Sequence, residues 1–121
     1  MATANKIIET VDKLKANAYE PEEKFRWICD LDGMVKRLVM QELESVGYVY
    51  PDDLDTELLI PAPFEATYEL YLMAMIDLHN KEYGEYNNNL LTFNTRFDEY
   101  RKAYIREHMP KSSGTYRNVM G

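Results

Sequence analysis

The residue types that most often carry chemistry are sparse in this chain and widely spaced. Its two histidines, His79 and His108, stand far apart, and its one cysteine, Cys29, is distant from both. A zinc site needs His, Cys or Glu ligands at short spacing, and the sequence has no His-x-x-x-His, Cys-x-x-Cys or Glu-x-x-His pair. We therefore expect no zinc site, and we interpret His79 as a hydrogen-bonded side chain at the margin of the core.

Two acidic segments resemble cation-binding loops only superficially. If Gly33 in ICDLDGM held the sixth position of a calcium loop, Ile28 and Val39 would stand where oxygen ligands are required. The second segment contains Asp52, Asp53, Asp55 and Glu57. It has neither the glycine nor the regular ligand spacing of a calcium loop, so a solvated acidic loop is the favoured interpretation.

No catalytic motif is present. The chain has no Gly-x-Ser-x-Gly sequence and no glycine-rich phosphate loop. Cys29 follows Ile28 in an apolar stripe, which is typical of an inert buried thiol rather than a nucleophile. The sequence therefore predicts a protein that is not an enzyme and that binds no cofactor and no metal.

Composition narrows the class of protein further. The chain has 121 residues, which is the size of one domain, with a net charge of −7 and a pI near 4.8. An acidic protein is not expected to bind DNA non-specifically, and no specific nucleic-acid binding is predicted. The single cysteine fits a reducing cytosol, no segment approaches the apolar length of a membrane span, and the N-terminus does not resemble a signal peptide.

Helical periodicity defines the elements that would position any site. The first helix is expected over residues 3–15, with Thr3 as its N-cap. The second is expected over residues 21–44, where Pro21 suits the first turn. Its apolar stripe consists of Phe25, Ile28, Leu31, Val35, Leu38 and Val39. Gly33 lies within this stripe, where it would permit a close crossing by another helix.

The remaining helices complete an all-α, four-helix-type bundle over residues 1–109. The third is expected over residues 64–83, ends at Gly84, and is apolar over enough of its circumference to be central. The fourth extends to residue 109 and carries a heptad-like seam of Tyr86, Leu90, Phe93, Phe97, Tyr100 and Tyr104. Because Asn87–Asn89 would weaken a helix interior, its start is expected near Asn88 or Asn89 rather than at Glu85.

The segment between the second and third helices, residues 45–63, predicts a long irregular loop. GYVY and ELLI flank the acidic turn PDDLD, so a small hairpin is one option, although Pro51 and Pro61 limit strand pairing. Loops of this length usually have a function or are ordered by a partner. After Pro110 the polar sequence KSSGTYRNVMG predicts a flexible C-terminal tail over residues 110–121.

Two features suggest contacts with another chain, and each has an alternative. The apolar run Leu58, Leu59 and Ile60 either covers the bundle or meets another subunit. Residues 42–57 carry only acidic charge, whereas residues 101–121 are mainly basic, so the two segments either meet head-to-tail between copies or are merely solvated. The candidate interface residues are Leu58, Leu59, Ile60, Asp52, Asp53, Asp55, Arg106, Lys111, Tyr116 and Arg117.

The order of these segments resembles a known family. KFRWICDLDGMVKRLV is followed by an irregular acidic stretch and then by LLIPAPFEATYELYL and EYGEYNNNLLTFN. This arrangement is similar to the small helical head–tail connector, or neck adaptor, proteins of tailed bacteriophages and prophages. The resemblance covers nearly the whole chain, and its motifs are signatures of fold and assembly rather than of catalysis.

The resemblance implies a structural role in virion assembly. Family members form a ring that docks beneath the portal protein, continues the channel through which DNA passes, and receives the next neck or tail-completion protein. Such a protein would be made in the bacterial cytoplasm and reside in the virion neck, with residues 45–63 and 110–121 contacting neighbours. The alternative from a different class is a small regulatory module that binds a partner helix on its tyrosine-rich face.

Overall fold

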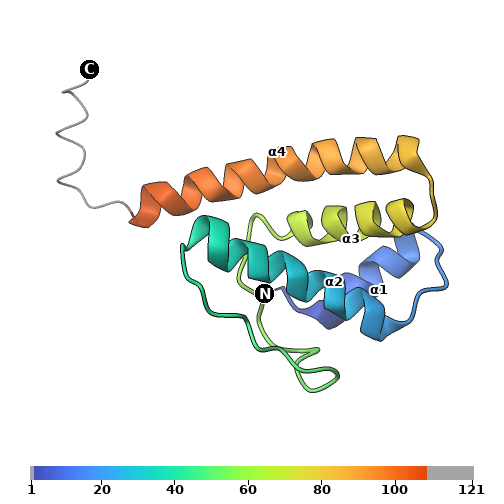
Figure 1. Ribbon diagram of the computed structural model, residues 1–121, viewed down its shortest axis with the longest axis horizontal. Coiled ribbons are helices and arrows are strands. Elements are labelled where there is room, and N and C mark those ends of the chain that lie inside the picture. Colours follow the sequence, from blue (N-terminus) through green and yellow to red (C-terminus); the bar gives the residue numbers. More distant parts are fainter. Residues whose placement is uncertain (1, 109–121) are drawn as a thin grey trace.

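The computed structural model describes residues 2–108, and within them the chain is helical (Figure 1). The elements are α1 (Ala4–Leu14), α2 (Pro21–Met34), the π-helical turn η1 (Val35–Val39), α3 (Ala66–His79) and α4 (Tyr83–His108). The predicted all-α class is confirmed. No helix in this part of the chain is both long and apolar enough to cross a bilayer.

The helices are arranged around α3. The long helix α4 lies antiparallel along one side of α3, while α1 and α2 pack on its other side (Figure 1). This central position agrees with the broad apolar face of α3, in which Tyr68, Leu72 and Ile76 are completely buried. The predicted seam of α4 also faces inward, with Phe93 and Tyr100 as its most buried members.

The first two helices begin where the sequence predicts. The Oγ1 of Thr3 accepts a hydrogen bond from the Lys6 amide at 3.3 Å, which caps α1. Pro21 occupies the first turn of α2. The predicted end at residue 44 is wrong, because helical structure stops at Val39 and Gln41 adopts a positive φ of 58°.

Two expectations about the apolar stripe of α2 need correction. Leu38 was expected inside but is 59% exposed, since the wider turn of η1 rotates it away from the core. Gly33 does not mark a helix crossing, because a Cβ at this position would meet the Arg37 side chain of the same helical segment and no other helix.

The start of α4 also differs from the prediction. Helix α4 begins at Tyr83, so Gly84 lies inside it rather than ending α3, and the left-handed residue between the two helices is Lys81, with φ of 64°. The asparagines are tolerated because Asn89 donates a 2.7 Å hydrogen bond to the buried carboxylate of Asp77 on α3. This tertiary contact outweighs the low helix propensity of asparagine.

The long loop contains no hairpin within the described residues. It pairs instead with the N-terminal segment, through a bridge between Thr3 and Glu57 and through backbone bonds from Asn5 N to Leu54 O and from Leu58 N to Ala2 O, each 2.9 Å long. The distal part of the loop extends away from the helices (Figure 1). Residues 54–60 are therefore attached to the bundle of their own chain.

Candidate functional site

The apolar run at the end of the loop belongs to the core of its own chain. Leu58 is 4% exposed and Ile60 is fully buried, while Leu59 is half-buried. Of the two alternatives raised by the sequence, burial against the bundle is therefore the one observed for Leu58 and Ile60. Both side chains belong to the core cluster of their own chain, which leaves almost none of their surface free for a partner.

Two of the three acidic candidates, Asp53 and Asp55, form hydrogen bonds within their own chain. Asp53 accepts hydrogen bonds from the Val49 amide and from the Thr56 hydroxyl, and these bonds lower the pKa of its carboxyl group. Asp55 accepts a 3.3 Å bond from the side chain of Asn5. Asp52 is exposed and forms no hydrogen bond or ion pair with another described residue, so it is the acidic candidate that remains available.

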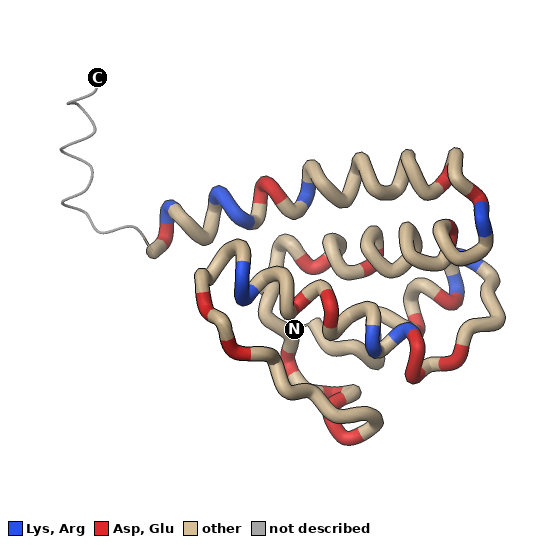
Figure 2. The backbone as a smooth tube through the Cα atoms, in the orientation of Figure 1, with Lys and Arg blue, Asp and Glu red and all other residues tan. Residues whose placement is uncertain are grey.

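The loop is acidic and the C-terminal part of α4 is basic, as the sequence predicts, but some of the acidic side chains are paired with a nearby lysine. Figure 2 shows acidic residues along the loop and basic residues on the C-terminal half of α4. Lys36 lies 3.4 Å from Glu42 and 3.8 Å from Glu44, so part of the loop's charge is balanced by η1. Arg106 is exposed in the last turn of α4. The candidates Lys111, Tyr116 and Arg117, and the predicted tail, lie outside the described residues.

A buried carboxylate that sequence analysis did not single out holds the end of the loop in place. Asp32 on α2 is completely buried and accepts hydrogen bonds from three donors. These are the Tyr48 hydroxyl at 2.9 Å, the Leu59 amide at 3.1 Å, and the Tyr68 hydroxyl. The Tyr68 oxygen in turn accepts a 2.8 Å bond from the Ile60 amide. One carboxylate thus joins α2, α3 and both ends of the loop.

The electrostatics of this network follow from its burial. Desolvation raises the pKa of Asp32 above its ordinary value, although hydrogen bonds from Tyr68, Leu59 and Tyr48 oppose the shift. Burial and the neighbouring Asp32 charge raise the pKa values of Tyr48 and Tyr68 as well. Both tyrosines therefore remain protonated donors at neutral pH, which suits a structural network rather than acid–base chemistry.

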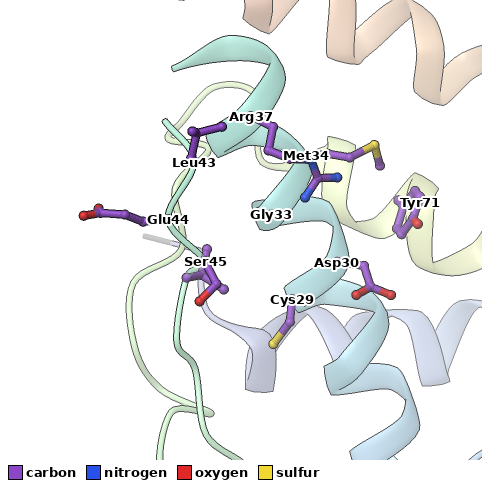
Figure 3. A pocket seen from close by; sticks show the side chains of 10 residues that line it. Cys29, Asp30, Gly33, Met34, Arg37, Leu43, Glu44, Ser45 and Tyr71 are labelled. Carbon is purple, nitrogen blue, oxygen red and sulfur yellow. The ribbon is translucent and has the colours of Figure 1, made fainter. Parts of the chain in front are cut away.

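A hollow of about 520 Å³ lies where residues 43–46 pass over α2 and η1. Figure 3 shows Cys29, Asp30, Gly33, Met34 and Arg37 from the helical side, Leu43, Glu44 and Ser45 from the loop, and Tyr71 from α3. The hollow contains one cation and two carboxylates but no histidine. Burial and the nearby charge of Asp32 raise the pKa of Cys29 to about 11, so this thiol is not an activated nucleophile.

Apolar side chains beside this hollow are left uncovered. Leu43, which lines the hollow, is 96% exposed, and Leu38 and Val49, which do not line it, are exposed on the chain segments before and after residues 43–46. We call these three residues the apolar rim. A leucine with almost its entire side chain in water gains nothing from folding of the isolated chain, so the apolar rim is the part of this surface best suited to burial by another molecule.

A cluster of three carboxylates at the other end of the bundle has the ligands of a cation site. Oxygens of Asp77, Glu82 and Glu85 lie within 4.8 Å of one another. The ammonium of Lys15 lies 2.7 Å from Asp77 and 2.9 Å from Glu85, and these contacts raise the pKa of Lys15. The lysine thus supplies the positive charge that the buried Asp77 requires, and a metal ion is not needed for that purpose.

No protein-family model, curated protein or solved structure matches the chain.

Proposed function

We propose that the protein is a structural component of phage assembly, a neck adaptor that forms a ring under the portal protein and extends the DNA channel. The observation that carries this proposal is the apolar rim, where Leu43 is 96% exposed beside a hollow of about 520 Å³. An exposed apolar surface of this kind indicates an interface that is buried when the protein binds its partners. The family resemblance supplies the identity of those partners.

Two further features are consistent with a conduit. The net charge of −7 would keep the protein from gripping the DNA that passes through it. The last turn of α4 is exposed from Ile105 to His108 and precedes the segment expected to contact the portal or a neighbour. Residues 45–53, the part of the loop that is not attached to the N-terminal segment, would bridge adjacent subunits.

The rival function, a module that binds a partner helix on its tyrosine-rich face, has less support. Tyr68 of α3 is fully buried and bonded to Asp32 on α2, Tyr71 of α3 packs on Phe93 of α4, and Tyr100 of α4 is 3% exposed. A partner helix would have to displace neighbouring helices to reach these rings.

The proposal is tested by mixing the protein with a purified portal ring and measuring complex mass by light scattering over a concentration series. We expect stoichiometric attachment, lost in Leu43→Asp and after removal of residues 110–121. Leu91→Asp is the matched control, since Leu91 is 68% exposed on α4 and is not part of the apolar rim. A protein that neither associates nor attaches at any concentration would favour the regulatory module instead.

A further inference from the structure

A second hollow, of about 310 Å³, lies where the N-terminus of α2 meets the C-terminus of α3. Three aromatic rings line it, those of Tyr19, Trp27 and His79, together with the carboxylate side chains of Glu20 and Glu23. We call it the aromatic hollow. Its lining includes no residue of the apolar rim, and the proposed function does not use it.

The rings of the aromatic hollow are held in a fixed arrangement. The centroids of Tyr19 and Trp27 are 5.5 Å apart with planes at 68°, and Tyr19 stands at 75° to His79. The Tyr19 hydroxyl donates a 2.7 Å hydrogen bond to Asn80, and the His79 Nδ1 lies 2.9 Å from the Met75 carbonyl oxygen. Trp27 and His79 lie closer to parallel, with centroids 4.9 Å apart and planes at 32°, so Tyr19 stands across this pair, and aromatic faces attract cations.

The carboxylates add a negative charge that is only partly balanced. Glu20 is exposed and forms no ion pair with any residue between 2 and 108. Glu23 pairs with Arg26 on the surface, at 3.5 Å. Aromatic faces beside an unpaired carboxylate favour a lysine or arginine side chain over a neutral or acidic ligand.

The chain itself contains a matching segment. Residues 109–121 carry Lys111 and Arg117 and no acidic residue. Helix α4 ends at His108, and its C-terminal end lies at the opposite end of the bundle from the C-terminal end of α3 (Figure 1). The hydrogen bond between Asn89 and Asp77 places Asn89 beside the C-terminal part of α3. From Asn89 to His108, helix α4 is about 29 Å long.

This distance decides which copy supplies the cation. Lys111 follows His108 by three residues, so in the same chain it lies at most about 11 Å from His108. Arg117 lies at most about 32 Å from His108, and only when the chain between them is fully extended. A chain therefore fills its own hollow only by running straight back along the bundle. A neighbouring copy, placed head-to-tail, presents the same residues without that constraint.

We propose that the aromatic hollow receives a basic side chain from residues 109–121 of an adjacent copy. The contact joins two different surfaces, so it is heterologous and generates a ring when the rotation between subunits closes. The inference rests on the proposed ring assembly and specifies one of its contacts. Each contact is weak by itself, and repetition around a ring compensates for that.

Trp27 is the only tryptophan, so its fluorescence reports on the aromatic hollow directly. The test titrates a synthetic peptide of residues 109–121 into the full-length protein at low concentration. We expect a saturable change in Trp27 emission, and binding weakened about tenfold or more when Lys111 and Arg117 of the peptide are both replaced by alanine. The peptide variant leaves the fold of the protein untouched.

Matched protein variants locate the contact. Glu20→Lys together with Glu23→Lys should abolish the response. Glu9→Lys together with Glu57→Lys, at two exposed positions, changes the net charge by the same amount and should preserve it. Absence of a saturable response, or equal loss in both double variants, would overturn the inference. Portal attachment is measured separately: attachment without peptide binding refutes only this contact, and peptide binding without attachment or ring formation refutes the proposed function alone.

Discussion

Asp32 on α2 and Tyr68 on α3 are joined by a hydrogen bond in the interior, and both side chains are completely inaccessible to solvent. The same carboxylate also binds the Leu59 amide, and the same hydroxyl binds the Ile60 amide. The pair therefore fixes the path of the chain as it leaves the long loop. Most of our stability predictions follow from this arrangement.

The loss of stability on replacing Asp32 should depend strongly on which residue takes its place. Asp32→Ala leaves the Leu59 amide and two tyrosine hydroxyls without their acceptor and should cost about 3 kcal/mol. Asp32→Asn keeps one oxygen acceptor and removes a buried charge, so a cost of about 1 kcal/mol is expected. Urea unfolding followed by Trp27 fluorescence measures both values, and equal costs would show that the hydrogen bonds contribute little.

The stability of the protein should vary with pH in the way expected for the buried carboxyl group of Asp32. Burial raises the pKa of Asp32 in the folded protein above its ordinary value of 3.8, so the folded state binds this proton more tightly than the unfolded state. The associated stabilisation is complete below pH 3.8 and is lost as pH rises through the raised pKa. The unfolding free energy of wild type minus that of Asp32→Asn should therefore fall over this window. A flat or rising difference would contradict the assignment.

The Tyr68 hydroxyl should contribute far more than an equally buried tyrosine hydroxyl elsewhere. Tyr68→Phe removes a donor to Asp32 and an acceptor for Ile60, with an expected cost of about 2 kcal/mol. Tyr100→Phe is the matched control, since Tyr100 is 3% exposed but its hydroxyl has no hydrogen-bond partner among the described residues. Its cost should stay below about 0.5 kcal/mol.

A double-mutant cycle with Asp32→Asn then separates the bond from other effects. The two substitutions should be non-additive by about 1 kcal/mol, because each removes the same interaction. Additive costs would mean that Tyr68 acts through packing alone.

Periodicity was sufficient to predict the helical class, the central place of α3 and the inward seam of α4, because these follow from burying apolar faces. It was insufficient where tertiary contacts override local preference. Asparagine is a weak helix former, yet Asn89 lies inside α4 because it binds the buried Asp77. Whether Leu58 and Ile60 cover the bundle or meet a partner could not be decided from the sequence, because local sequence does not reveal that the loop returns to the core.

The Asp32 network did carry a signal in the sequence that was not used. Ile28, Asp32, Val35 and Val39 follow the four–three–four spacing of one helix face. An aspartate on such a face is either exposed by a break in the helix or buried with partners. Its donors could not be identified in advance, because the Leu59 amide and the Tyr48 hydroxyl come from an irregular segment whose path no periodicity defines.

Lys15 should prove to be the residue that keeps the carboxylate cluster free of metal. Its ammonium lies 2.7 Å from the fully buried Asp77 and 2.9 Å from Glu85, so Lys15→Met leaves a buried charge without its counterion. We expect a loss of about 2 kcal/mol, less than for a completely buried pair because Lys15 is 19% exposed. Thermal unfolding followed by circular dichroism measures the loss.

Calcium should then substitute for the missing ammonium. Three carboxylates within 4.8 Å offer oxygen ligands once the lysine is removed, so millimolar Ca²⁺ should raise the Tm of Lys15→Met by a few degrees. The same concentration should leave wild type unchanged, since its carboxylates are already neutralised. Adding Glu85→Gln to Lys15→Met removes one ligand charge and should abolish the calcium effect. If wild type gained as much as Lys15→Met, the stabilisation would arise elsewhere, and Lys15 would not be what excludes the ion.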